Sequence, residues 1–102
     1  MIAQFTLVPL GTKTDSLSKN LVKAMKLVAD SGLNYKIGPM GTVVEGDWWQ
    51  VMNLINRCRK TILREAPRVS IQIFLDDRPS AKDPIKSKVR SLERKMGIKI
   101  KK

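Results

Sequence analysis

Two stretches of the chain alternate apolar and polar residues with the period of two that is typical of a half-buried β-strand. They span residues 2–8 and 68–75. Their apolar faces consist of Ala3, Phe5 and Leu7 in the first, and of Val69, Ile71, Ile73 and Leu75 in the second. Two shorter strands are predicted at residues 35–37 and 42–45, because the turn Gly38-Pro39-Met40-Gly41 separates two apolar runs there.

Three other stretches repeat apolar residues at the spacing of an amphipathic helix. The first is capped by Asp15 or Ser16 and ends at Gly32, and the second is capped by Asp47 and ends before Pro67. The third is capped by Asp83 and begins with Pro84. Their apolar positions are Leu17, Leu21, Ala24, Met25 and Val28; Val51, Leu54, Ile55, Cys58 and Ile62; and Ile85, Val89, Leu92 and Met96.

The predicted order of elements is β-α-β-β-α-β-α. Its first six elements are those of an α+β ferredoxin-like sandwich, in which two helices cover one face of a four-stranded antiparallel sheet. The seventh is an additional C-terminal helix. The 102 residues form one domain by length. Residues 97–102 are expected to be a basic, frayed tail.

The sheet face without helices is expected to carry no charge. Its predicted residues are Gln4, Thr6, Val8, Thr42, Val44, Ser70, Gln72 and Phe74. A surface depleted of charge and built from small polar and β-branched groups suits a second sheet packed on it, with room for a ligand. The alternative is an exposed face that happens to be uncharged.

The composition limits the kinds of active site and metal site that the chain can form. The chain has no histidine, so it lacks the usual general base and the usual zinc ligand. No nucleophile–base pair, metal set or phosphate loop is visible, and we expect neither an enzyme nor a metal site. Cys58 is the single cysteine, which fits a reducing compartment, and no signal peptide is apparent. We therefore expect a cytoplasmic protein without a membrane span.

The net charge is +11 and is concentrated near the C-terminus. From Ala81 to Lys102, nine Lys and Arg residues face two acidic ones. This cluster is either a solvated helix face with its tail or a surface for an anionic partner. Weak nucleic-acid binding through the cluster is thus an alternative function.

Several short motifs, in order, resemble a family of small bacterial and archaeal ferredoxin-like proteins described as thiamine-binding (YkoF-like, MTH-type). The motifs are "PLG" at residues 9–11, "SLS" at 16–18, "SGLNY" at 31–35, "MGTVVEGD" at 40–47 and "DDR" at 76–78. The resemblance implies sheet-packed dimers that pair into tetramers. It also implies a thiamine-like ligand that is bound without chemistry and no other cofactor.

The stretch from Tyr35 to Trp49 contains the only Tyr and both Trp residues around Glu45. Glu45 either ends a strand or lies beside a pocket, where a carboxylate and aromatic groups would suit an aminopyrimidine and a cationic thiazolium. Because adjacent helical residues point about 100° apart, one tryptophan is expected to meet another subunit. The candidate ligand-binding residues are Thr6, Pro9, Gly11, Ser16, Tyr35, Met40, Gly41, Thr42 and Glu45. The candidate interface residues are Gln4, Val8, Val44, Ser70, Gln72, Phe74 and Trp48.

Overall fold

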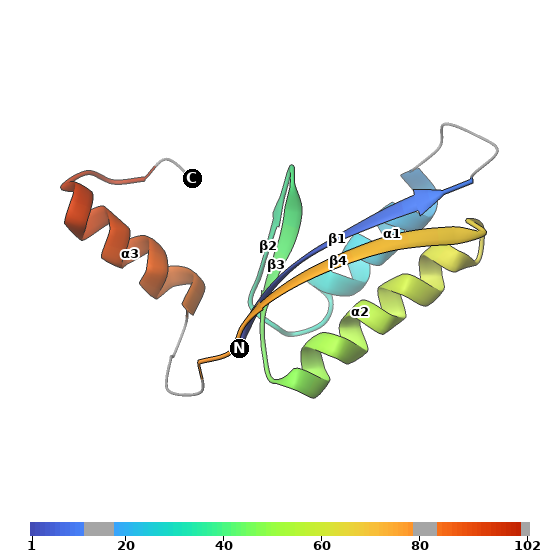
Figure 1. Ribbon diagram of the computed structural model, residues 1–102, viewed down its shortest axis with the longest axis horizontal. Helices are drawn as coiled ribbons and strands as arrows, with labels where there is room; N and C mark the ends of the chain where they lie inside the picture. The colour runs from blue at the N-terminus through green and yellow to red at the C-terminus, as the bar shows by residue number, and fades with distance from the viewer. Residues whose placement is uncertain (12–17, 79–83, 101–102) are drawn as a thin grey trace.

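The computed structural model describes residues 1–11, 18–78 and 84–100 (Figure 1). Its elements are β1 (Ile2–Leu10), α1 (Ser18–Ala29), β2 (Tyr35–Gly38), β3 (Gly41–Glu45), α2 (Trp48–Leu63), β4 (Arg68–Asp76) and α3 (Pro84–Met96). The predicted order of elements is confirmed. The predicted caps Asp15, Ser16 and Asp83 lie outside the described residues.

The strands form one antiparallel sheet in the order β2-β3-β1-β4, which places β1 and β3 in the centre. Helices α1 and α2 lie side by side on one face of this sheet (Figure 1). This is the predicted ferredoxin-like α+β arrangement. None of the helices in the described ranges has the length and apolar character needed to cross a bilayer.

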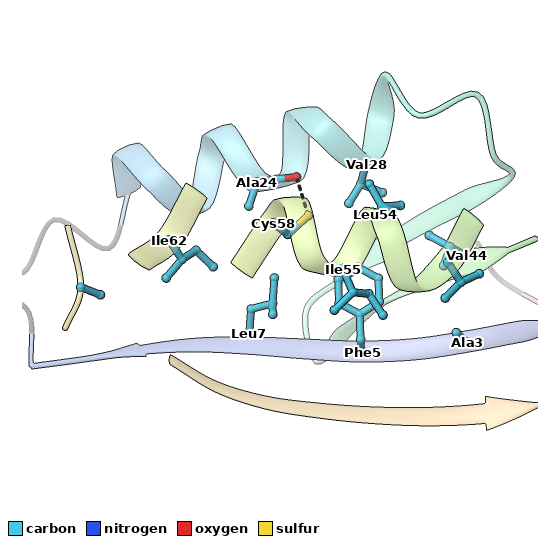
Figure 2. Packing of buried hydrophobic residues seen from close by; sticks show 12 residues of the cluster. Ala3, Phe5, Leu7, Ala24, Val28, Val44, Leu54, Ile55, Cys58 and Ile62 are labelled. Atoms are coloured by element: carbon cyan, nitrogen blue, oxygen red, sulfur yellow. Dashed lines mark hydrogen bonds between the residues drawn. The ribbon is translucent and has the colours of Figure 1, made fainter. Parts of the chain in front are cut away.

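The core lies between the two helices and the sheet, as Figure 2 shows. Its buried residues are Ala3, Phe5, Leu7, Ala24, Val28, Val44, Val51, Leu54, Ile55, Cys58, Ile62 and Ala66. The Cys58 thiol donates a hydrogen bond to the Ala24 carbonyl at 3.4 Å, which links the facing helices. Burial raises the pKa of Cys58 to about 11, so this side chain stays a neutral thiol within the core.

Asp47 caps helix α2, as predicted, and it does so within a capping box that includes Gln50. The Asp47 carboxylate accepts from the Gln50 N–H at 2.8 Å, and the Gln50 side-chain oxygen accepts from the Asp47 N–H at 3.0 Å. These two bonds satisfy backbone donors that a helix start would otherwise leave unpaired. The strand-to-helix corner after β3 is therefore firmly set.

Strand β1 extends past its predicted end and includes Pro9. Residues Ile2–Phe5 pair with β3, whereas pairing with β4 continues to Leu10. The Met1 carbonyl accepts from the Gly46 N–H next to β3, and backbone groups alternate sides along a strand, so the Pro9 nitrogen also faces the β3 side. No β3 residue pairs at that position, and the missing N–H of Pro9 costs no ladder bond.

The predicted face of β3 is wrong. Thr42 lies opposite Phe5 and Val44 lies opposite Ala3, and residues paired across antiparallel strands share a face. Thr42 and Val44 are therefore on the helix side, where they are 4% and 0% exposed. The run Thr42-Val43-Val44-Glu45 has adjacent valines, so its pattern alone does not fix which one faces the core.

Helix α3 stands apart from the two-layer body (Figure 1). The molecule measures 48 × 28 × 21 Å, and its radius of gyration of 15.2 Å exceeds the ~13 Å typical of a compact chain of this length. Within the described ranges, two polar interactions attach the start of α3. The Ile85 N–H donates to the Glu45 carboxylate at 2.7 Å, and Lys88 forms an ion pair with Asp76. Gly97, with φ +72°, ends the helix in the left-handed conformation that favours glycine.

Candidate functional site

The face of the sheet opposite α1 and α2 forms an open face, defined by side chains of the three strands β1, β3 and β4. Its members are Gln4, Thr6, Val8, Val43, Ser70, Gln72 and Phe74. The strand register places Val43, Gln4 and Phe74 in one row, and Thr6 beside Gln72 in the next. Phe74 is 73% exposed and Val8 47%. A large aromatic side chain thus lies uncovered on a surface whose centre carries no charge.

Gly41 lies beneath the side chains of Gln4 and Thr6. A Cβ atom at Gly41 would lie 3.2 Å from both the Gln4 side-chain nitrogen and the Thr6 methyl group. These two side chains consequently lean over the glycine, and Gly41 is paired with another glycine, Gly38, on β2. The glycine is needed here because a side chain at this position would press against Gln4 and Thr6.

Charged groups lie only at the margins of the open face. Lys36 on β2 is paired with Val43, and Glu45 and Asp76 lie on either side of Ile2. The hydrogen bond and charge of Lys88 hold the pKa of Asp76 below its usual value. Lys36 was missed by sequence reasoning because the short strand β2 has no alternation from which to assign its faces.

Glu45 accepts a hydrogen bond at each of its two carboxylate oxygens. One carboxylate oxygen accepts from the Ile85 N–H at 2.7 Å, and the other accepts from the Asn34 amide at 3.3 Å. A carboxylate offers about four acceptor positions, so two remain for other donors. Glu45 therefore positions the start of α3 whether or not it also contacts a ligand.

Tyr35 and Thr42 do not join Glu45, contrary to the predicted pocket. Both belong to the helix side, because Tyr35 is paired with Val44 and Thr42 with Phe5. The Thr42 hydroxyl donates to the sulfur of Met25 at 3.5 Å beneath α1. A ligand on the open face cannot reach either side chain through the sheet.

Pro9 and Gly11 lie at the opposite end of β1 from Glu45. Glu45 is beside Ile2, and the seven residue steps from Ile2 to Pro9 span roughly 23 Å of strand. Gly11 has φ +76°, and a Cβ there would lie 2.9 Å from the Pro67 ring, so packing explains this glycine. One small ligand in one subunit cannot touch both ends. Ser16 lies outside the described residues.

Two remaining candidates protrude from the surface. Met40, in the turn between β2 and β3, is 83% exposed. Trp48 is 48% exposed and Trp49 is 72% exposed, so neither tryptophan is taken into the core. Trp48 lies on α2, in the helix layer, and its role as an interface anchor stays a prediction.

The sequence also gave no sign of a buried amide on α1. Asn20 is 8% exposed, and its side-chain nitrogen has no hydrogen-bond partner among the residues described. Within the same ranges, no three His, Cys, Asp or Glu side chains are grouped as a metal site would require. The C-terminal cations lie mainly on α3, and their binding of nucleic acid stays a prediction.

Comparison with known proteins identifies the relationship. The family model described as "Thiamine-binding protein" matches residues 3–93, from β1 to the last turns of α3. The chain belongs to this thiamine-binding protein family. The resemblance inferred from the ordered motifs is thereby confirmed.

Relatives and solved structures agree with this membership. A UPF0045 protein from Mycobacterium bovis is 36% identical over 95 residues, which is 92% of each chain. A hypothetical protein from Methanocaldococcus jannaschii has a crystal structure with a TM-score of 0.78 and 28% identity, covering 89% of this chain and 93% of that one. A Thermotoga maritima structure, provisionally described as a thiamine biosynthesis or salvage protein, shares the fold with a TM-score of 0.75 at 22% identity, covering 89% and 96%.

Proposed function

We propose that this protein binds thiamine, or a related aminopyrimidine or thiazole compound, without transforming it. We further propose that it does so as a homo-oligomer in which open faces pack on one another. The observation that carries the proposal is an exposed, centrally uncharged sheet face in a chain of the thiamine-binding family. The open face offers amide and hydroxyl groups in the middle and a carboxylate at its margin.

The composition of the open face suits such a ligand. Gln4, Thr6 and Gln72 can donate and accept hydrogen bonds, as an aminopyrimidine requires. Phe74 offers an exposed π face, which attracts a cationic ring such as a thiazolium.

The assembly would complete the site. A ligand lying on a single sheet remains open to water on one side, whereas small-molecule sites normally enclose most of the ligand surface. A second open face would supply the missing wall and would cover Phe74 and Val8, both exposed in one chain. Exposed apolar groups beside a charge-free centre are typical of a protein interface.

Calorimetric titration of thiamine into the full chain tests the proposal. We expect saturable binding by the wild type. Glu45→Gln keeps the size of the side chain but removes its charge and replaces one acceptor oxygen by an amide nitrogen that only donates. It should weaken binding roughly ten- to a hundredfold if the carboxylate meets the ligand cation, since a charge-assisted hydrogen bond contributes about 1.5–3 kcal/mol.

Asp47→Asn is the matched control, because it removes a neighbouring negative charge while asparagine caps a helix about as well as aspartate. Amide exchange of α3, measured on both variants, separates loss of the ligand contact from displacement of the helix. Absence of heat with the wild type would exclude thiamine. Equal affinity of wild type and Glu45→Gln would leave Glu45 only its role at the start of α3.

A further inference from the structure

The outer surface of the helix layer holds a second feature, unrelated to the open face. A groove of about 380 Å³ runs between α1 and α2. It is lined by Lys23, Lys26, Leu27, Asp30, Arg57, Thr61 and Arg64. Four of these residues are cations and one is an acid, so the lining has a net charge of +3.

Two short rows of cationic residues line the walls of this groove. Lys23 and Lys26 are one helical turn apart on α1, and Arg57 and Arg64 are two turns apart on α2. The two helices pack closely, as the hydrogen bond from Cys58 to Ala24 shows (Figure 2), so the rows face each other across the groove. Cations thus converge from both walls.

None of these four cations forms an ion pair within the described ranges, and Asp30 offsets only one of the four charges. The ion pair found in those ranges joins Lys88 to Asp76, far from the groove in the sequence. Like charges held close together repel and lower stability. A bound multivalent anion would relieve this repulsion, and arginine matches phosphate oxygens with two parallel N–H donors.

We propose that the groove between α1 and α2 binds a compact oligophosphate anion. Its size suits a chain of a few phosphate groups. Its lining has no aromatic side chain on which a nucleobase could stack, and Asp30 places a negative charge just past the end of α1. Both features disfavour an extended nucleic acid along the groove. The Thr61 hydroxyl donates its proton to the Arg57 carbonyl at 3.0 Å, so the cationic side chains supply the donors for the phosphate groups.

Inorganic tripolyphosphate is the probe for the test, with calorimetry and the Tm as readouts at low ionic strength. We expect saturable binding and a raised Tm for the wild type. The double variant Arg57→Gln with Arg64→Gln should bind about tenfold or more weakly, because two charge-assisted contacts are lost. Glutamine is nearly as good a helix former as arginine, so α2 should persist, which circular dichroism checks.

Two further double variants show whether a loss of affinity comes from the groove or from the change in net charge. Lys23→Gln with Lys26→Gln removes the opposite wall and should weaken binding as well. Arg90→Gln with Arg94→Gln makes the same change in net charge on α3, outside the groove, and should alter affinity by no more than about twofold, as expected for screened distant charges.

Three results would overturn the proposal. One is the absence of saturable tripolyphosphate binding. Another is an equal loss in the α3 control, which would mean that net charge alone attracts the anion. The third is tighter, Arg57-dependent binding of a single-stranded RNA oligonucleotide, which would assign the groove to an extended polyanion.

Discussion

The two faces of the β-sheet differ in burial: α1 and α2 cover one face, and the other face is exposed. Beneath α1 and α2, Val44 and Ala3 are fully buried side by side. On the other face, the neighbouring row of Val43, Gln4 and Phe74 is left without a covering layer, and Phe74 is mostly exposed. Strands β1 and β3 therefore supply buried core residues on one side and an uncovered surface on the other, while β4 adds only partly buried side chains to the core.

The difference shows where the stability of one chain comes from. Burial of apolar area contributes about 25 cal/mol per Å², and nearly all of it is gained on the helix side. The open face and the apolar stripe of α3 add little in an isolated chain, since Leu92, Met96 and Phe74 remain exposed. These surfaces are available for assembly and ligand recognition, and four predictions test this division.

The largest effect is expected from a charge placed on either side of β3. Val44→Asp would bury an unpaired carboxylate under the helices, at a cost of more than about 4 kcal/mol, and should unfold the chain. Val43→Asp, one residue earlier, should lower the free energy of unfolding of the monomer by no more than about 1 kcal/mol. Urea denaturation measures both. Similar losses in the two variants would contradict the assignment of the faces.

Charged substitutions on the open face should dissociate the proposed oligomer without unfolding the subunit. Thr6→Lys or Gln72→Glu would bury an unpaired charge between two subunits, which costs several kcal/mol of association free energy. Light scattering should then show a monomer near 11.5 kDa where the wild type is larger. Asn53→Lys on the exposed side of α2 is the control and should leave the assembly intact. A monomeric wild type at micromolar concentration would contradict the proposed oligomer.

The covered side should also respond to alkaline pH through Cys58. Burial raises the pKa of its thiol from 9.0 to about 11, so above pH 9 the unfolded chain loses this proton while the folded chain keeps it. Stability should therefore fall between pH 9 and 11, by up to about 1.4 kcal/mol per pH unit from this group. Cys58→Ala should flatten the dependence, and the difference between the two urea-denaturation profiles isolates the thiol from Lys and Tyr. Parallel profiles would show that Cys58 ionises equally in both states.

The smallest effect concerns the starts of α2 and α3. Asp47→Ala removes the capping box and should lower global stability by about 1 kcal/mol. Glu45→Gln exchanges a charged acceptor of the Ile85 N–H for a neutral one and should raise amide exchange only in α3, severalfold. Hydrogen exchange distinguishes the two. Faster exchange throughout the sheet in Glu45→Gln would show that α3 is not attached as a separate unit.

Strong local patterns made the fold predictable. The alternation in β1 and the capped apolar stripe of α2 were confirmed, because each of these elements has one buried and one solvated side. The alternation also identified β4 as a strand, but on its helix side Val69 and Ile71 are only partly buried, and Ile73 and Leu75 are 36% and 39% exposed. Which residues of β3 face the core was not predictable, since either of its two adjacent valines could be the buried one. The stripe of α3 predicts a buried face but not its partner, and the helix stands clear of the body (Figure 1).

The candidate site was predicted only in part for a related reason. Thr6, Gln4 and Gln72 were correctly grouped because their strands alternate. Tyr35 and Thr42 were placed on the wrong side because β2 and β3 are too short to show a period. The distance between Pro9 and Glu45 depends on strand pairing, which connects residues far apart in the chain and leaves no local mark in the sequence.

The position of Pro9 has a further consequence for solubility. Beyond Phe5, β1 has β4 on one side and no paired β3 residue on the other, so this stretch is a local sheet edge. Exposed edges with free N–H groups recruit strands from other molecules and start aggregation. The Pro9 nitrogen faces that edge and cannot donate. An incoming strand would meet a missing donor in its ladder, and Pro9 thereby protects the chain from uncontrolled edge-to-edge growth.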